Sequence, residues 1–327
     1  MRREQIRLCR PITEDEVKTY QNLGVVLLRG VFDLQAINAL RGAIDRSVKT
    51  LGESKSGYDF TELARAYEDH DEAVIAANSE GQHNISAIVG YLRHQNASLL
   101  RDQQADGGGH FYVDTDLSAR IREIRSFSMS QAAGEIAAAL LKSDQVRLFG
   151  DQLFVKEPGT RERTAFHQDA SFFPIDGEQC CVFWIPVDPV TEEIGAMQYV
   201  RGSHKSRTVF KPNVFVSQTE LPGAEGDRLP DIEANPDLYD IVSFDVEPGD
   251  IIVHHYRTIH GAGGNRSRYQ VRRALSVRYC GDDIRGVERP WVPSRPDIKT
   301  NVKPGEAISG PDFPVVWQRR HATDAAA

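Results

Sequence analysis

After Ser143 the sequence consists largely of short runs of β-branched, aromatic and other apolar residues, and each run ends at a turn signal. Pro158-Gly159 and Pro248-Gly249 are two of these signals. The runs with strand character cover residues 145–149, 152–156, 164–173, 180–187, 196–200, 250–256 and 272–280. Many short strands of this kind pack as a β-sandwich or a small barrel. We therefore predict one of these two architectures for this half of the chain.

The first part of the chain has helical patterns instead. Thr13-Glu-Asp-Glu16 is a capping box that predicts a short helix, and the apolar run Val25–Leu28 predicts a strand. A second helix is expected over residues 33–45, because Asp33 is a good N-cap and the apolar residues after it recur at helical spacing. A long helix is expected over residues 117–141. Helices followed by many strands indicate an α+β protein.

Two long stretches have a weaker pattern. Residues 52–115 are polar and irregular, with short helical stretches near residues 60–67 and 85–94, and we expect a mobile cover or a surface insertion there. Residues 206–242 contain Pro212, Pro222, Pro230 and Pro236. This second stretch is predicted to be a long loop between strands that lies over one mouth of the barrel.

Composition argues against several classes of protein. The formal charge of −8 is unfavourable for binding nucleic acid or an anionic membrane, and no apolar run approaches the ~18 residues of a membrane span. The basic start lacks the apolar segment of a secretory signal. The four cysteines are too few and too badly placed for a disulfide framework, since Cys180 and Cys181 are adjacent and Cys280 is remote in sequence. A small-molecule substrate and a cytoplasmic location are the expectations that remain.

The motif His167-Gln-Asp169 suggests a metal site. In a strand, residues two apart point to the same face, so one imidazole and one carboxylate are expected to converge. These two groups form two thirds of the 2-His-1-carboxylate facial triad, which binds Fe(II) and leaves positions open for small ligands. His260, which lies 260 − 167 = 93 residues downstream and also follows an apolar strand, is the best candidate for the third ligand.

Several features then follow one another in a fixed order. They are Lys156, His167-Gln-Asp169, Phe183-Trp184, Gly202-Ser-His204, Pro248-Gly-Asp250, His260-Gly-Ala-Gly-Gly-Asn265 and Arg272-Arg-Ala-Leu-Ser276. With this ordered set the chain resembles the phytanoyl-CoA dioxygenase family of Fe(II)- and 2-oxoglutarate-dependent oxygenases, from about residue 145 to residue 279. The resemblance implies a double-stranded β-helix, also called a jelly-roll or cupin-like core, with N-terminal helices packed on one sheet.

The resemblance also implies roles for particular residues. His167, Asp169 and His260 would bind the iron, and Arg272 would pair with the distal carboxylate of 2-oxoglutarate, because a guanidinium matches a carboxylate bidentately. Arg273 is the rival for this second role, since adjacent strand residues face opposite ways. Strand parity favours Arg273, which shares a face with Leu275 and Val277, whereas the family pattern favours Arg272, and we choose Arg272.

Further residues could contact the co-substrate. Gln152 and Lys156 precede the triad on a strand and could hydrogen-bond 2-oxoglutarate, although a lysine most often faces solvent. Trp184 is either a core residue or a wall of the 2-oxoglutarate site. His204 is expected in a structural turn. Of His254 and His255, one should point outward, and the pair favours a supporting role over ligation.

The predicted reaction is hydroxylation of an unactivated C–H bond of a small organic molecule, with dioxygen as co-substrate and release of succinate and CO2. The resemblance supports hydroxylation because Asp169 is a carboxylate, whereas halogenating relatives have a small residue there. A non-catalytic jelly-roll binding protein and a zinc-dependent hydrolase with the same ligands are the alternatives. We expect a single domain with helical support and cover (residues 1–143), a jelly-roll catalytic core (144–285) and a C-terminal extension (286–327). The sequence does not indicate an oligomeric state.

Overall fold

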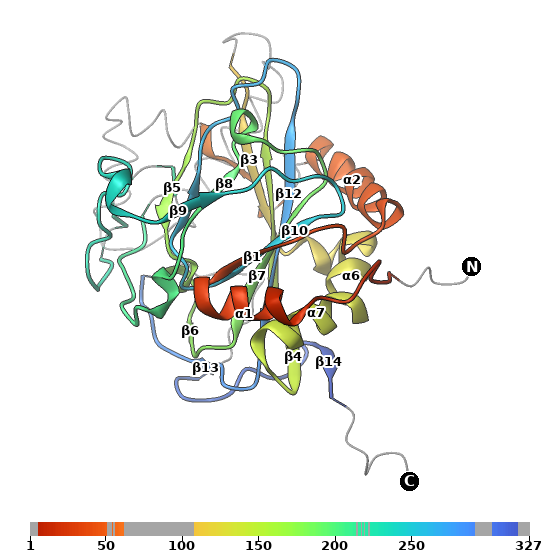
Figure 1. The fold of residues 1–327 in the computed structure, drawn as a ribbon, viewed down its shortest axis with the longest axis vertical. Coiled ribbons are helices and arrows are strands. Elements are labelled where there is room, and N and C mark those ends of the chain that lie inside the picture. Colours follow the sequence, from red (N-terminus) through yellow and green to blue (C-terminus); the bar gives the residue numbers. More distant parts are fainter. Residues whose placement is uncertain are drawn as a thin grey trace.

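The structure is a computed structural model, and it describes residues 6–50, 54, 56–61, 108–213, 215–216, 218, 220–221, 223–291 and 303–319. Two antiparallel sheets form its centre (Figure 1). The large, 8-stranded sheet has the order β1 (Val25–Leu28), β10 (Ile251–His255), β7 (Cys180–Pro186), β12 (Arg272–Cys280), β4 (Gln145–Lys156), β3 (Phe111–Thr115) and β2 (Tyr58–Asp59), and β14 (Val315–Gln318) also pairs with β4. The second, 4-stranded sheet has the order β5 (Thr164–His167), β11 (His260–Ala262), β8 (Met197–Val200) and β9 (Ile241–Ser243).

The remaining elements are short strands and helices. β6 (Ile175–Asp176) and β13 (Arg285–Gly286) form a separate ribbon. The α-helices are α1 (Glu14–Leu23), α2 (Leu34–Lys49), α6 (Arg122–Ser128) and α7 (Gln131–Leu141). The 3-10 helices are η2 (Leu117–Ala119), η3 (Asp169–Phe172), η4 (Glu192–Ile194), η5 (Ser203–Lys205) and η6 (Pro236–Leu238).

One hydrophobic core lies between the two sheets, and a second lies between the large sheet and the helices. Trp184, Ile252 and Ala274 of the large sheet pack against residues of the small sheet such as Met197 and Tyr199. On its other face the large sheet shares a buried cluster with α1, α2, α6 and α7. Because this sheet is covered on both faces, nearly every residue of β7 and β12 is buried.

The predicted N-terminal elements are confirmed. The Thr13 hydroxyl accepts from the Glu16 amide at 3.2 Å, and the Glu16 carboxylate accepts from the Thr13 amide at 2.7 Å, so both halves of the capping box are present. Asp33 caps α2 by accepting from the Ala36 amide at 2.7 Å. The strand Val25–Leu28 begins and ends where it was expected.

The single helix predicted over residues 117–141 is wrong. The chain forms η2, α6 and α7 there, and Ser130 separates the two α-helices. Ser130 has an extended backbone, and its hydroxyl accepts from the Ala133 amide at 3.2 Å, so it begins a new helix at the point where α6 has ended. The side chain thus replaces the hydrogen bond that a continuous helix would supply.

Three strand predictions also need correction. Residues 145–149 and 152–156 belong to one strand, β4, and a register shift opposite Arg278 and Tyr279 marks a bulge inside it. The strand predicted over residues 164–173 ends at His167, where η3 follows almost at once. The large sheet also contains β1, β2, β3 and β14, which come from the segments on either side of residues 144–285.

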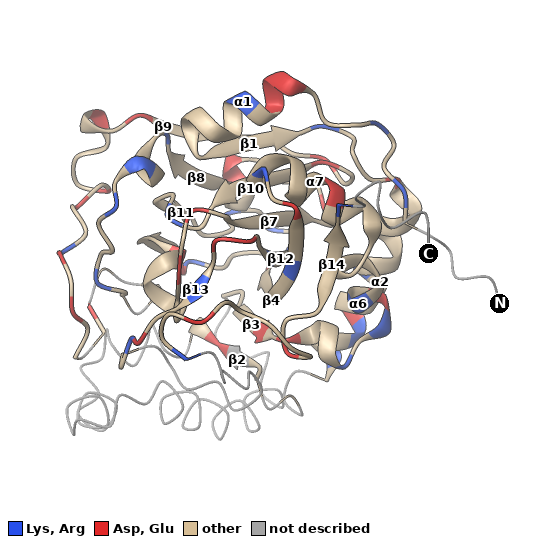
Figure 2. Cartoon of the chain, turned by 90° about the horizontal axis from the view of Figure 1, so that it is seen from below, with Lys and Arg blue, Asp and Glu red and all other residues tan. Residues whose placement is uncertain are grey.

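The remaining predictions concern the long loop, the helical stretches of residues 52–115 and membrane-spanning helices. The described residues between η5 and β9 form little regular structure, as the prolines predicted. The helical stretches expected near residues 60–67 and 85–94 lie almost entirely outside the described residues. Acidic and basic residues alternate over helices and outer loops, while the central strands are mostly uncharged (Figure 2). Among the described residues, no helix combines the length and apolarity needed to cross a membrane.

Candidate metal centre

His167, Asp169 and His260 lie together in the cavity between the two sheets. His167 at the end of β5 pairs in register with His260 at the start of β11, and their ring centroids are 4.3 Å apart. The Oδ1 atom of Asp169 lies 3.5 Å from Nε2 of His167 and 3.9 Å from Nε2 of His260. All three side chains are buried, and their candidate ligand atoms fall within 4.8 Å of one another.

Backbone carbonyls set the tautomers of both histidines. Nδ1 of His167 lies 2.9 Å from the carbonyl oxygen of Ala165, and Nδ1 of His260 lies 2.9 Å from that of Thr258. A carbonyl oxygen can only accept, so each Nδ1 carries the proton and each Nε2 presents a lone pair to the cavity. Two nitrogen lone pairs and a carboxylate oxygen that face one another form a site for a cation, and these donor types suit Fe(II).

Asp169 joins this cluster although, contrary to the prediction, it does not lie on a strand. It begins η3, but Gln168 before it is still extended (φ −118°, ψ 126°), so the alternation of side chains continues up to Asp169. The turn is anchored by the segment that joins β10 to β11: the Gln168 side chain donates to the Arg257 carbonyl at 2.9 Å, and the Ala170 amide donates to the Tyr256 carbonyl at 2.9 Å.

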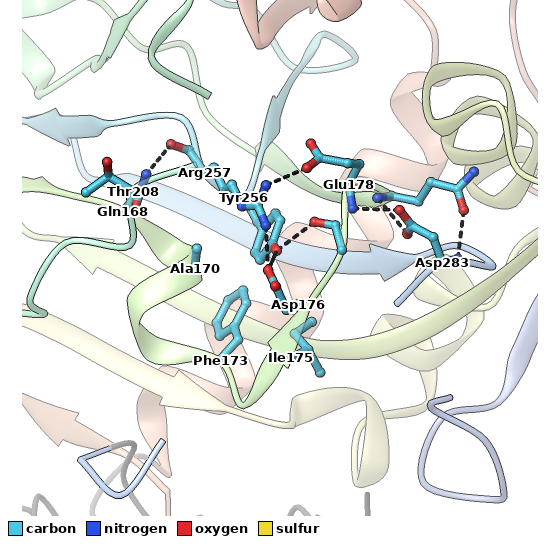
Figure 3. A network of polar contacts seen from close by, with 12 residues as sticks. Gln168, Ala170, Phe173, Ile175, Asp176, Glu178, Thr208, Tyr256, Arg257 and Asp283 are labelled. Atoms are coloured by element: carbon cyan, nitrogen blue, oxygen red, sulfur yellow. Dashed lines mark hydrogen bonds and ion pairs between the residues drawn. The ribbon is translucent and has the colours of Figure 1, made fainter. Parts of the chain in front are cut away.

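The segment that anchors the turn is itself held by ion pairs. The Arg257 guanidinium contacts Asp176 at 2.5 Å and Glu178 at 2.6 Å (Figure 3). Tyr256 donates from its hydroxyl to the Gly177 carbonyl at 2.8 Å. These contacts fix the backbone next to Asp169, and Figure 3 shows them gathered around Asp176 and Arg257.

The electrostatics of the cluster favour the protonation states that bind a metal. Burial alone would raise the pKa of Asp169, but contacts with His167 and His254 outweigh it and hold that pKa well below its usual value. Burial, with the nearby His167 and His254, holds the pKa of His260 well below its usual value as well. Asp169 is therefore an anion and His260 a neutral base near pH 7.

Arg272 lies in the same cavity. Its side chain is buried, its guanidinium is 5.0 Å from the centre of the Trp184 ring, and Nη2 contacts the Met197 sulfur at 3.1 Å. No carboxylate among the described residues pairs with it, and its Nε has no hydrogen-bond partner there. Burial lowers the pKa of Arg272 to about 10. A buried guanidinium without an anion is costly, so it provides a strong site for a carboxylate ligand.

Arg273 points to the opposite face of β12. Its guanidinium donates to Asp188 at 2.6 and 2.8 Å and also pairs with Asp45. Strand parity therefore gave the wrong preference, because Leu275 and Val277 face the helices while Ala274 faces the core between the sheets. An apolar face identifies the cavity side only where the other face is solvated, and this sheet has no solvated face.

Of the other residues predicted to contact the co-substrate, one lines the cavity and two do not. Trp184 lines the cavity beside Arg272. Lys156 is buried rather than solvent-facing, and it donates to the Gly263 carbonyl at 2.7 Å, in the glycine-rich turn after His260. Gln152 is buried and accepts from Arg278 at 2.5 Å. A role of Lys156 or Gln152 in binding 2-oxoglutarate stays a prediction, because neither side chain is part of the described cavity wall.

Three cavity residues were missed or undervalued. His254 faces the cavity, whereas His255 faces away and donates from Nε2 to the Glu178 carbonyl at 2.8 Å, so one of the pair does point outward as expected. Arg278 shares the inner face of β12 with Arg272, a parity visible in the sequence. Phe215 comes from the long loop, and its ring centroid lies 4.7 Å from that of His167. Nothing in the local sequence distinguishes Phe215 from other loop residues.

Two minor predictions are settled by side-chain positions. His204 lies in the turn η5 near α1, with Nε2 3.2 Å from the Gln21 carbonyl, and it is not part of the metal cluster. Cys280 is remote from Cys180 in sequence but not in space, since their sulfur atoms lie 3.7 Å apart across β12 and β7. Both remain free thiols.

Comparison with known proteins places these features in a family. The phytanoyl-CoA dioxygenase (PhyH) family matches residues 20–274. A probable alpha-ketoglutarate-dependent hypophosphite dioxygenase of Stutzerimonas stutzeri is 25% identical over 229 residues, which cover 70% of this chain and 74% of that protein. A probable phytanoyl-CoA dioxygenase of Caenorhabditis elegans is 32% identical over 127 residues, but the match covers only 37% of this chain and 38% of that protein.

Solved structures show the same fold. The epimerase SnoN from nogalamycin biosynthesis, in complex with Fe3+, alpha ketoglutarate and nogalamycin RO, superposes with a TM-score of 0.63 at 19% identity, covering 93% of this chain and 98% of SnoN. EctD from S. alaskensis, with 2-oxoglutarate and 5-hydroxyectoine, gives a TM-score of 0.57 at 15% identity, covering 94% of each chain. At these identities the likeness establishes the jelly-roll fold.

The class of protein follows from the family match and the donor set in the cavity: it is a non-haem iron dioxygenase that uses 2-oxoglutarate. Within that class the chain belongs to the phytanoyl-CoA dioxygenase family.

Proposed function

We propose that the protein hydroxylates an unactivated C–H bond of a small organic molecule and converts 2-oxoglutarate and dioxygen to succinate and CO2. The observation that carries the proposal is the convergence of two Nε2 lone pairs and one carboxylate oxygen beside a buried guanidinium that lacks an anion. The two nitrogens and the carboxylate oxygen provide a metal site, and Arg272 provides a site for a dicarboxylate co-substrate.

In this proposal His167, Asp169 and His260 bind the iron through Nε2, Oδ1 and Nε2. When bound by these residues, iron would supply the redox chemistry that links oxidation of 2-oxoglutarate to oxidation of the substrate. Arg272 binds the distal carboxylate, and Trp184 packs against the guanidinium and keeps it oriented. The helical layer of α1, α2, α6 and α7 packs on the face of the large sheet opposite the cavity and supports it.

The substrate side of the cavity is built from aromatic rings. Phe215 stacks on Phe154 with centroids 5.8 Å apart and an angle of 7° between the planes. Phe172 meets His167 edge-on at 5.7 Å. Such a wall suits an apolar part of a substrate and keeps water away from the metal. Relatives are named for substrates as different as hypophosphite and phytanoyl-CoA, so we assign substrate choice to this wall rather than to the metal ligands.

The test is an anaerobic titration of the apoprotein with Fe(II) and 2-oxoglutarate, monitored by the visible charge-transfer band of the iron–2-oxoglutarate complex. We expect the band in the wild type and in His204→Ala, whose imidazole lies outside the cluster. We expect no band in His167→Ala. A band of unchanged strength in His167→Ala would remove that residue from the metal site, and a wild type that formed no band would contradict the proposed function.

A further inference from the structure

His254 is the one histidine of the described cavity wall that the proposed metal site does not use. It lies on the inner face of β10 and is 2% exposed. Its ring centroid is 4.4 Å from that of His260 and 5.2 Å from that of Tyr199. A third imidazole in so small a space calls for an explanation.

The two oxygens of Asp169 face different partners. Oδ1 faces Nε2 of His167 and Nε2 of His260, at 3.5 and 3.9 Å. Oδ2 faces Nε2 of His254 at 3.5 Å. The two oxygens therefore have different neighbours: Oδ1 lies in the metal cluster, and Oδ2 points to Nε2 of His254, which can donate a hydrogen bond.

Structural stability does not explain His254. Neither of its ring nitrogens makes a hydrogen bond of ordinary length within the described part of the chain. A buried polar group without a partner typically destabilises a fold by ~1–3 kcal/mol. His255, its equally buried neighbour, shows the contrast: it donates to the Glu178 carbonyl at 2.8 Å and accepts from the Arg257 amide at 3.1 Å.

We propose that His254 is a positioning residue that donates from Nε2 to Oδ2 of Asp169 and so keeps the carboxylate bound to the metal through Oδ1 alone. The inference rests on the proposed metal site and adds a residue to it. A carboxylate that swings to present both oxygens would fill two coordination positions and leave fewer for the co-substrates. Groups that hold a ligand in place in this way typically change metal affinity 10- to 100-fold.

The experiment measures Co(II) binding to the apoprotein by calorimetry, without 2-oxoglutarate or turnover. His254→Phe keeps a planar ring of similar size but has no donor, and we expect a dissociation constant 10- to 100-fold above the wild-type value. His254→Gln keeps an N–H donor, and we expect it to recover most of the lost affinity. The visible Co(II) spectrum should change shape in His254→Phe and return toward the wild-type shape in His254→Gln, because bidentate binding of the carboxylate alters the coordination number.

His255→Phe is the matched control. It removes two structural hydrogen bonds, so we expect a lower melting temperature of the apoprotein with unchanged Co(II) affinity. The apoprotein of His254→Phe should melt no lower than the wild type, and His254→Leu serves as a second variant without a donor if the larger ring does not fit.

Wild-type Co(II) affinity in His254→Phe, or an equal loss in His254→Phe and His254→Gln, would overturn the inference and leave the metal site standing. Failure of the metal site itself would give a different result, since His167→Ala would then bind Co(II) as well as the wild type.

Discussion

Replacement of Arg272 by Met should make the apoprotein more stable and at the same time abolish the response to 2-oxoglutarate. Arg272 is buried, and none of the described carboxylates pairs with it. Met is unbranched, flexible and uncharged, so it fills most of the space beside Trp184 and Met197 without the desolvation penalty.

The magnitude follows from the pKa. Burial lowers the pKa of Arg272 from 12.5 to about 10. This difference of about 2.5 pH units, at 1.36 kcal/mol for each, corresponds to about 3 kcal/mol of destabilisation by the charge. Because the folded-state pKa is the lower one, the penalty decreases only above about pH 10 and is present in full at pH 7. Some of this gain will be offset by lost packing, so we expect a net increase of ~1–3 kcal/mol in the free energy of unfolding.

The assay is urea unfolding at pH 7 under nitrogen, with Co(II) as a redox-stable metal and with or without 2-oxoglutarate. A ligand at one hundred times its dissociation constant should stabilise the wild type by about 2.7 kcal/mol. Loss of two charge-assisted hydrogen bonds, each worth ~1.5–3 kcal/mol, should weaken 2-oxoglutarate binding in Arg272→Met by about 100-fold or more. The added stability should then disappear in this variant.

Arg273→Met is the control, because Arg273 lies on the helix-covered face of β12 and pairs with Asp188 and Asp45. We expect it to lose ~1–3 kcal/mol of stability and to keep the wild-type response to 2-oxoglutarate. The reasoning would be refuted if the two variants exchanged these results, or if Arg272→Met lost stability and still bound 2-oxoglutarate with wild-type affinity.

Two further predictions concern stability. Burial lowers the pKa of His255 to about 3, so the unfolded state binds one more proton than the folded state between about pH 3 and 6.5. The free energy of unfolding should therefore fall as pH falls through that range, by up to ~1.4 kcal/mol per pH unit. Urea unfolding of His255→Gln should show a shallower loss, and an unchanged slope would contradict this cause. Gly195→Ala, at φ 81°, would place its Cβ 2.7 Å from the carbonyl oxygen of Gly263, whereas Gly202→Ala, at φ 78°, meets nothing within 4 Å. Both variants should be destabilised by the ~1–2 kcal/mol that a left-handed backbone costs a residue with a Cβ. Gly195→Ala should lose a further ~1–3 kcal/mol of unfolding free energy and some Co(II) affinity, because its clash moves the turn after His260. Equal losses of stability in the two variants would show that the clash is relieved elsewhere.

Local sequence was enough for much of the frame. Capping side chains act within three residues, so Thr13 and Asp33 predicted where α1 and α2 begin. The same local chemistry was overlooked at Ser130, where it ends one helix and begins another. The strand β12 was predicted with its true bounds because a run of strand-forming residues there is bounded by turns.

For the site, the sequence by itself determined the chemistry of the ligands: a His-x-Asp motif and a distant histidine supplied the donor types of a facial triad, and the ordered set of motifs around them gave the resemblance to the family. Tertiary structure decided between the two arginines against strand parity, and it alone decided that His254 faces Asp169 and that Phe215 from the long loop lies against His167. The physical reason is that alternation along a strand specifies two faces but not which of them meets the other sheet. That choice, and every contact between residues far apart in the chain, depends on how the two sheets and the helical layer pack together.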